Sequence, residues 1–202
     1  MKIICIGRNY IDHAKELNNP VPSQPLVFMK PATAQLKNGS DFYYPEFSEN
    51  IHYELELILK ISKNGKYIEK KFAENYYDEI GLGIDFTARD LQDKCKEKGH
   101  PWEIAKAFDH SAVVGDFINK EDIQQDHIDF RLVKNDDVVQ QGNSKDLIFP
   151  FDTLIEHVSK FFTLNKGDLI FTGTPAGVGP IKIGDRLQGF LGEHSLLTCN
   201  IK

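Results

Sequence analysis

The chain has 202 residues, a length typical of one folded domain with its own hydrophobic core. Its 24 basic and 30 acidic residues give a net charge of -6 without a long block of one sign, which argues against nucleic acid as a partner. Apolar runs such as residues 169–171 are far too short to span a membrane. Scattered cysteines without a CxxC pair or a secretory leader favour a reduced, cytoplasmic protein.

The first third of the chain begins with strand-like sequence. Residues 2–6 form a short apolar run before a glycine, which indicates a buried strand. Apolar and histidine side chains then recur at helical spacing over residues 9–17, and an Asn-Asn-Pro sequence ends that pattern at Pro20. The Asn-Gly pairs at residues 38–39 and 64–65 predict tight turns between hairpin strands.

The rest of the chain combines two helices with many short strands. Residues 88–98 and 151–163 have helical spacing, and the second segment has a broad apolar face. Residues 168–171, 186–190 and 195–198 are strand-like and separated by glycines. No repeat or linker interrupts the sequence. We therefore expect one domain over residues 1–202 with a β-rich α+β fold.

An acidic cluster is the strongest chemical signal in the sequence. If residues 52–59 form a strand, Glu54 and Glu56 share one face while the leucines between and after them occupy the other. Two buried carboxylates repel each other unless a proton or a cation neutralises them. Asp85, at the end of another predicted strand, supplies a third oxygen ligand for a hard cation such as Mg²⁺, Mn²⁺ or Ca²⁺. The alternative is a solvated strand face with Asp85 in a turn.

Two helices present further polar side chains. His13 and Glu16 lie three residues apart, so Glu16 is placed to orient His13 as a general base, or the two form a surface ion pair. Thr87 is predicted to cap the second helix. In that helix Arg89, Gln92 and Lys96 make a polar stripe, for which a solvated face is the default interpretation.

Two lysines and a glycine-rich loop are the remaining candidates. Lys30 and Lys106 lie in apolar surroundings, where an ammonium group needs an anionic partner, either in a binding site or in a structural ion pair. The loop at residues 172–179 follows a strand but lacks the Lys-Ser/Thr ending of a P-loop. Its amides and hydroxyls suit a carboxylate, or its glycines merely permit a tight turn.

Taken together, these motifs resemble the fumarylacetoacetate hydrolase superfamily, particularly its short acylpyruvase-type members. The resemblance covers nearly the whole chain and is carried, in order, by Gly7-Arg8-Asn9-Tyr10 with His13 and Glu16, Phe28-Met29-Lys30-Pro31, His52-Tyr53-Glu54-Leu55-Glu56-Leu57, Asp85 with Thr87-Ala88-Arg89-Asp90-Leu91-Gln92, Lys106-Ala107-Phe108-Asp109 and Thr172-Gly173-Thr174-Pro175-Ala176-Gly177-Val178-Gly179. It implies a mixed β-sandwich roll with a few short helices around a Mg²⁺ or Mn²⁺ site, in a homodimer.

The resemblance also implies roles for individual residues. The metal ligands would be Glu54, Glu56 and Asp85, and a lid helix would carry a water-activating dyad of His13 and Glu16. Lys106 matches the catalytic lysine beside the metal. The remaining matches are substrate-binding positions, namely Arg89, Gln92, Thr174 and Lys30.

The reaction implied by the resemblance is hydrolysis of a small keto acid. The metal would hold the pyruvoyl end of a 3-acylpyruvate while the carbon-carbon bond between C3 and C4 is cleaved, giving pyruvate and a carboxylic acid. The same site suits decarboxylation or enol-keto tautomerisation of oxaloacetate, or a related dienoate isomerisation. An alternative of another class is a non-catalytic keto-acid-binding protein with a structural metal.

Overall fold

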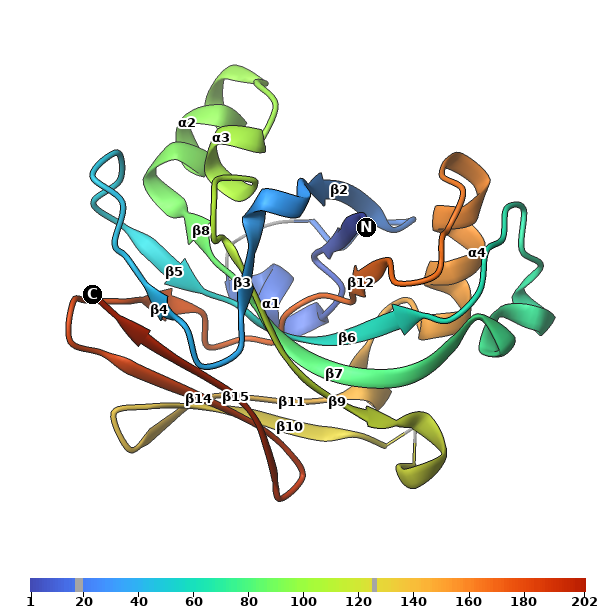
Figure 1. The fold of residues 1–202 in the computed structure, drawn as a ribbon. Helices are drawn as coiled ribbons and strands as arrows, with labels where there is room; N and C mark the ends of the chain where they lie inside the picture. Colours follow the sequence, from blue (N-terminus) through green and yellow to red (C-terminus); the bar gives the residue numbers. More distant parts are fainter. Residues whose placement is uncertain (17–19, 125–126) are drawn as a thin grey trace.

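The computed structural model describes residues 1–16, 20–124 and 127–202 (Figure 1). Its largest sheet contains seven strands in the spatial order β2 (Leu26–Lys30), β1 (Ile3–Gly7), β12 (Leu169–Phe171), β6 (Leu55–Ile61), β7 (Tyr77–Asp85), β9 (Ala112–Asn119) and β3 (Gln35–Lys37). A second sheet has five strands, β11 (Asp137–Asn143), β10 (Asp129–Lys134), β14 (Arg186–Leu191), β15 (His194–Ile201) and β4 (Asp41–Phe42). A third comprises β13 (Gly179–Pro180), β5 (Ile51–Tyr53) and β8 (Thr87–Ala88).

The two large sheets pack face to face, with the five-stranded sheet beneath the curved seven-stranded one in Figure 1. Both sheets are mixed, because β1 pairs in parallel with β12 and β15 in parallel with β4, while most other neighbours are antiparallel. The α-helices are α1 (Ile11–Glu16), α2 (Arg89–Lys98), α3 (Glu103–Lys106) and α4 (Phe151–Phe161). The predicted β-rich α+β class, a mixed sandwich with a few short helices, is therefore confirmed.

Strand β6 lies in the middle of the large sheet and is covered on both faces. Leu55, Leu57 and Leu59 belong to the main core between the sheets. Ile58 points the other way, into a smaller apolar cluster with Phe171. The residues that alternate in the sequence therefore point to opposite faces of β6. Because both faces are covered, the polar residues on the second face also lie inside the protein.

The helices differ from the predictions mainly at their ends. The helix expected at residues 9–17 is the shorter α1, and Leu17 lies outside the described residues. Helix α2 begins at Arg89 and ends at Gly99, whose φ of 66° closes it in the left-handed conformation. The prediction that Thr87 caps this helix is wrong, because Thr87 belongs to β8 and the N-cap position is Ala88.

The two Asn-Gly hairpins predicted from sequence are also wrong. At residues 38–39 the chain passes from β3 in one sheet to β4 in the other, so the turn joins layers instead of paired strands. At residues 64–65 it lies inside a longer connection between β6 and β7, and Gly65 bonds with Leu164 instead. Two-residue hairpin turns are found instead at residues 135–136, between β10 and β11, and at residues 192–193, between β14 and β15. Asn135, Asp136 and Gly192 all have positive φ.

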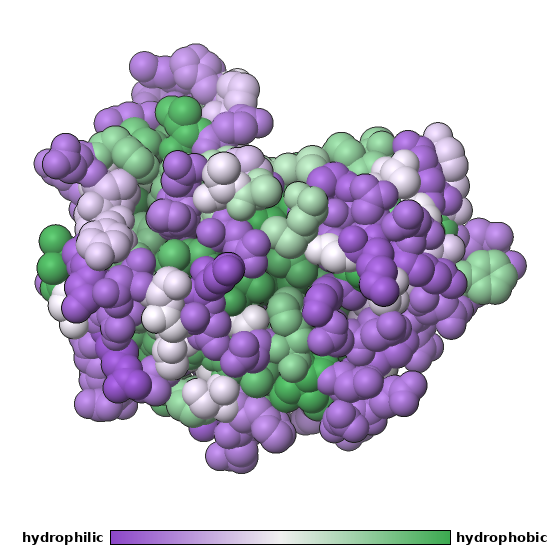
Figure 2. All heavy atoms as spheres, viewed as in Figure 1, coloured by the Kyte–Doolittle hydropathy of each residue, from purple (hydrophilic) through white to green (hydrophobic). Residues whose placement is uncertain are grey.

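The molecular surface is predominantly polar on the face seen in Figure 2, with apolar side chains visible in a hollow near its centre. Every helix in the described ranges is too short or too polar to traverse a lipid bilayer.

Candidate metal centre and active site

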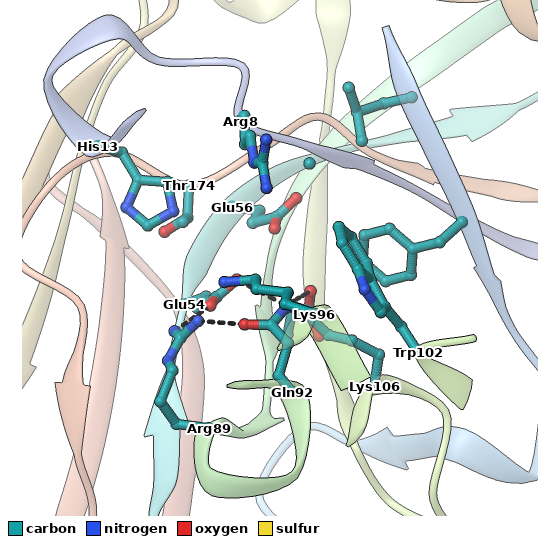
Figure 3. Close-up of a pocket in the computed structure, with 14 residues that line it drawn as sticks. Arg8, His13, Glu54, Glu56, Arg89, Gln92, Lys96, Trp102, Lys106 and Thr174 are labelled. Carbon is teal, nitrogen blue, oxygen red and sulfur yellow. Dashed lines mark hydrogen bonds and ion pairs between the residues drawn. The ribbon is translucent and has the colours of Figure 1, made fainter. Parts of the chain in front are cut away.

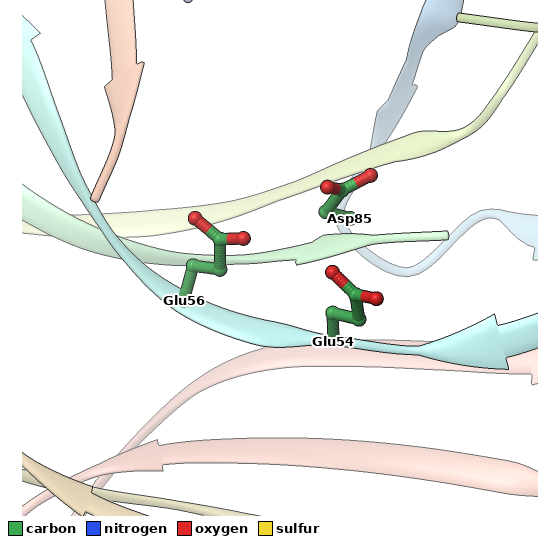
Figure 4. Close-up of side chains that lie close together, drawn as sticks. All are labelled: Glu54, Glu56 and Asp85. Atoms are coloured by element: carbon green, nitrogen blue, oxygen red, sulfur yellow. The ribbon is translucent and has the colours of Figure 1, made fainter. Parts of the chain in front are cut away.

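Three buried carboxylates meet where β6 and β7 lie side by side (Figure 4). Glu54 immediately precedes β6, Glu56 lies on it, and Asp85 ends β7. The Asp85 amide donates a hydrogen bond of 2.9 Å to the Glu54 carbonyl, which fixes the two backbones together. One oxygen from each carboxylate lies within 4.8 Å of the others. The structure thus rules out the alternative of a solvated strand face.

The Lys106 ammonium group links two of these carboxylates. Its Nζ lies 2.8 Å from Glu54 Oε2 and 2.7 Å from Asp85 Oδ2, and it also donates to Thr87 Oγ1 at 2.6 Å. Burial alone lowers the pKa of Lys106, but Asp85 and Glu54 raise it above its ordinary value. Lys106 is therefore held as a cation beside the carboxylates.

Lys30 is a second buried lysine that contacts the carboxylate cluster. Its Nζ lies 2.7 Å from Asp85 Oδ1, and the side chain is fully buried. It also donates to the Lys106 carbonyl and, at 2.9 Å, to Ser111 Oγ. Lys30 therefore ties β2 to β7 and to the end of α3, and its polar contacts are all made within the protein core.

Glu56 has different surroundings from the other two carboxylates. Its described hydrogen-bond partner is the Gly173 amide, 2.6 Å from Oε2. Burial raises the pKa of Glu56, and the neighbouring charges of Asp85 and Glu54 raise it further, well above its ordinary value. A buried carboxylate in this position is stabilised by a proton or by an added cation. Three converging carboxylates are the donor set that Mg²⁺ and Mn²⁺ prefer, so these residues fit a divalent metal ion.

Helix α1 places His13 at one side of the cluster. His13 is buried, and its Nδ1 lies 3.3 Å from Glu16 Oε2, while Glu16 Oε1 accepts a hydrogen bond of 3.0 Å from the Gly177 amide. Glu16 thereby joins α1 to the glycine-rich loop. Burial lowers the pKa of His13, against the opposing charges of Glu54 and Glu16. With Nδ1 directed at Glu16, Nε2 is the ring nitrogen left for a ligand.

Thr174 reaches the site from the glycine-rich loop and is positioned by a residue that the sequence did not single out. Gln140, on β11, is buried and donates through Nε2 to Thr174 Oγ1 at 2.8 Å and to the Pro175 carbonyl at 3.0 Å. Its Oε1 accepts a hydrogen bond of 2.9 Å from the Leu55 amide, between the two glutamates. Because Thr174 Oγ1 accepts from Gln140, its own hydroxyl proton is free to donate to a ligand.

The polar stripe of α2 faces the site and is largely buried there. Arg89 lies 2.5 Å from Glu54 Oε1, and its other terminal nitrogen donates to Gln92 Oε1 at 2.6 Å. Together with Lys106, Arg89 holds the pKa of Glu54 below its ordinary value although burial raises it. Lys96, one turn after Gln92, is half-buried at the edge. The default interpretation of this stripe as a solvated helix face is wrong.

These elements enclose a pocket of about 420 Å³, including the part open to solvent (Figure 3). It brings together most of the residues predicted to form the site, namely His13, Glu54, Glu56, Asp85, Arg89, Gln92, Lys106 and Thr174. Glu16 and Lys30 contact two of these lining residues, His13 and Asp85 respectively. Four more residues line the pocket that the sequence analysis did not assign to the site, namely Arg8, Phe28, Lys96 and Trp102.

The whole chain, from residue 2 to residue 202, matches the family model described as the fumarylacetoacetate hydrolase C-terminal domain. The protein therefore belongs to the fumarylacetoacetate hydrolase family. The resemblance stated from the motifs is confirmed.

Among its relatives, the chain is 41% identical over 201 residues to the human protein named oxaloacetate tautomerase FAHD1, mitochondrial, covering 99% of this chain and 90% of that one. It is 40% identical over 189 residues to a Dictyostelium discoideum protein named oxaloacetate decarboxylase, mitochondrial, covering 93% and 87%. Its fold matches a crystal structure of fumarylpyruvate hydrolase from Pseudomonas aeruginosa with Mn²⁺ and pyruvate, at a TM-score of 0.93 and 36% identity, covering 100% and 89%.

The relatives' names favour chemistry on oxaloacetate over the acylpyruvate hydrolysis that was the main expectation from sequence. They also place those two relatives in mitochondria, whereas the cytoplasmic location expected for this chain stays a prediction.

Proposed function

We propose that this protein is a divalent-metal-dependent enzyme that acts on a short 2-oxo acid, and that its reaction is enol-keto tautomerisation of oxaloacetate. The observation that supports this most directly is the convergence of Glu54, Glu56 and Asp85 with the buried imidazole of His13 in one pocket. The choice of oxaloacetate draws on the names of the relatives.

Glu54, Glu56 and Asp85 would hold Mg²⁺ or Mn²⁺ in this proposal. A cation held there would supply Lewis-acid polarisation of the C2 oxygen of the substrate. Lys106 would lie beside the same oxygen and stabilise the negative charge that develops there. Lys30 would act indirectly, by holding Asp85 and Lys106 in place.

The remaining residues would orient the substrate. Thr174 would donate its hydroxyl proton to the C1 carboxylate, since Gln140 already donates to its oxygen. Arg89 and Gln92, which bond to each other, would contact the substrate from α2. The apolar rings of Phe28 and Trp102 also line the pocket and would exclude water.

His13 would move the proton. In the enol form the C2 hydroxyl would give its proton to Nε2, and the imidazolium would then return that proton to C3 as the carbon-carbon double bond becomes the C2-oxygen double bond. One O–H bond breaks and one C–H bond forms, so the reaction needs no co-reactant. Glu16 would keep the imidazole oriented through Nδ1.

Hydrolysis of a 3-acylpyruvate is the second candidate function. It is favoured by the similarity to the fumarylpyruvate hydrolase structure, and by the His13–Glu16 pair, which is suited to deprotonating a water molecule. Decarboxylation of oxaloacetate is a related alternative, named in the Dictyostelium relative. A protein that only binds keto acids would form no product.

A substrate panel followed by NMR distinguishes these functions. Purified protein with Mg²⁺ is incubated separately with oxaloacetate, acetylpyruvate and fumarylpyruvate. We expect faster ketonisation of enol-oxaloacetate than in a protein-free control with the same Mg²⁺, and no more pyruvate than that control forms. Pyruvate above the control from an acylpyruvate would instead support hydrolysis, and pyruvate above the control from oxaloacetate would support decarboxylation. If all three substrates behave as in the control, the protein is not this enzyme.

The homodimer implied by the family resemblance is likewise a proposal. Sedimentation of the purified protein would test it, with a species of about twice the monomer mass expected.

A further inference from the structure

Arg8 and Lys96 are cationic side chains that line the pocket but form no described ion pair with its carboxylates. Glu54 and Asp85 are already paired with Arg89, Lys106 and Lys30. In the part of the chain that the structure describes, Arg8 makes no ion pair with a carboxylate. Lys96 has only Asp93, an exposed neighbour in the same helix at 3.8 Å.

Arg8 is held in an unusual backbone conformation. Its φ is 59°, in the left-handed region that a non-glycine residue adopts only at a cost. The next residue, Asn9, locks the chain there: its Nδ2 donates to the Thr172 carbonyl at 2.8 Å, and its Oδ1 accepts from the Phe149 amide at 2.8 Å. Strain that is maintained by buried hydrogen bonds at a pocket indicates that the direction of the Arg8 side chain matters.

Lys96 approaches the same space from the other side. It lies on the face of α2 that carries Arg89 and Gln92, and in Figure 3 Arg8 and Lys96 enter the pocket from opposite sides. Burial lowers the pKa of Lys96, and the charges of Arg89 and Arg8 lower it further, against the opposing charges of Asp93 and Glu54. Cations gathered in this way repel one another, and an anion bound between them removes that repulsion.

We infer that Arg8 and Lys96 form the subsite that binds the second, distal carboxylate of the dicarboxylic substrate. The inference rests on the proposed function, in which the 2-oxo acid end of the substrate occupies the metal. Arg8 would bind the distal carboxylate through its planar fork, and Lys96 would add a second charge.

A matched pair of ligands tests this subsite. Freshly dissolved oxaloacetate and 2-oxobutanoate have the same chain length and differ by a carboxylate in place of a methyl group. Their dissociation constants are measured by calorimetry with saturating Mg²⁺. We expect the wild-type protein to bind oxaloacetate about ten to a hundred times more tightly.

The variants Lys96→Met and Arg8→Asn should lose most of this preference, with weaker oxaloacetate binding and 2-oxobutanoate binding within about twofold of wild type. Asparagine suits Arg8 because it tolerates the left-handed backbone. Arg8→Lys should recover part of the preference. Lys94→Met, an exposed charge removed from the same helix, should change neither constant. Thermal unfolding of each variant confirms that it is folded.

Equal affinities in the wild-type protein, or a preference that survives in both charge-removing variants, would overturn the subsite alone. Equal weakening of both ligands would also overturn it, since the residues would then act on the whole pocket. If neither 2-oxo acid binds in the presence of Mg²⁺, the proposed function fails, and the subsite fails with it.

Discussion

Within the carboxylate cluster, Glu56 is the residue whose charge the surrounding side chains leave unbalanced. Glu54 and Asp85 contact lysine or arginine, whereas the described partner of Glu56 is the neutral Gly173 amide. Gly173 has a φ of 106°, and an added Cβ would meet the Asn9 side chain at 2.6 Å, so a glycine is needed for this amide to reach Glu56. The glycine-rich loop therefore positions the Glu56 carboxylate as well as carrying Thr174.

Replacing Glu56 by glutamine should stabilise the protein when metal is chelated. The folded-state pKa of Glu56 is raised above 4.5, so its ionisation destabilises the wild-type protein increasingly as the pH rises through that folded-state pKa. In urea unfolding with EDTA, Glu56→Gln should gain about 1–2 kcal/mol at alkaline pH and less at pH 5. A variant less stable than wild type at pH 8 would show that Glu56 is not under this repulsion.

Removing Gln140 should have two separable effects. Gln140→Leu leaves the buried Leu55 amide without its acceptor, which should cost about 1–3 kcal/mol of stability, and it frees Thr174, which should raise the KM for the substrate several-fold. Chemical denaturation and steady-state kinetics measure the two effects.

In a Thr174→Val background the KM effect of Gln140→Leu should disappear while the stability loss remains. An undiminished KM effect there would mean that Gln140 does not act through Thr174.

At the scale of secondary-structure elements, α1 makes His13 sensitive to pH in a defined direction. The lowered pKa of His13 keeps its imidazole neutral below pH 6.5, so the acid limb of kcat/KM should lie below that value. Glu16 raises the pKa of His13, and Glu16→Gln should therefore move the limb to still lower pH. A pH–rate profile measures this, and an upward shift in the variant would contradict the assigned role of Glu16.

The strands and helices show which features are readable from sequence. The alternation of Glu54 and Glu56 with leucines was readable because a strand's period of two is local, and so was the helical spacing of α4. The turns at residues 38–39 and 64–65 were misassigned because an Asn-Gly pair specifies a turn but not which strands it joins. Gln140 and Thr174 are separated by 34 residues, and no local pattern connects them.

The family resemblance supplied what local patterns lacked, namely the grouping of His13, Lys106 and Thr174 with the carboxylates. It did not assign Arg8 or Lys96 a role. Arg8 owes its position to a positive φ, which is a property of the folded backbone. Lys96 has the sequence pattern of a charge on an exposed helix face, and only the position of α2 beside the pocket distinguishes it. Arg8 and Lys96, the two residues of the proposed subsite, were therefore the least predictable part of the pocket.

At the scale of the whole molecule, Lys30 connects elements from distant parts of the chain. Its ammonium group bonds to Asp85, Lys106 and Ser111 in the core. Lys30→Met would therefore remove one of the two cations that contact Asp85 and leave the buried Lys106 carbonyl without this donor. We expect a loss of about 3–5 kcal/mol in unfolding free energy. Lys60→Met is the matched control, because its ion pair with Glu79 is exposed and should contribute below about 1 kcal/mol. Similar losses in both variants would contradict this account of Lys30.

The rate at which enol-oxaloacetate converts to the keto form, followed by its ultraviolet absorbance as Mg²⁺ is titrated, tests the central claim most directly. The wild-type rate should rise with Mg²⁺, reach saturation and return to the protein-free rate after chelation. Glu56→Gln, which we expect to be at least as stable as the wild-type protein without metal, should show a response at least about 100-fold weaker at the same Mg²⁺ concentration. A protein-dependent rate that is indifferent to chelation, or unchanged in Glu56→Gln, would contradict a metal-dependent site built on these carboxylates.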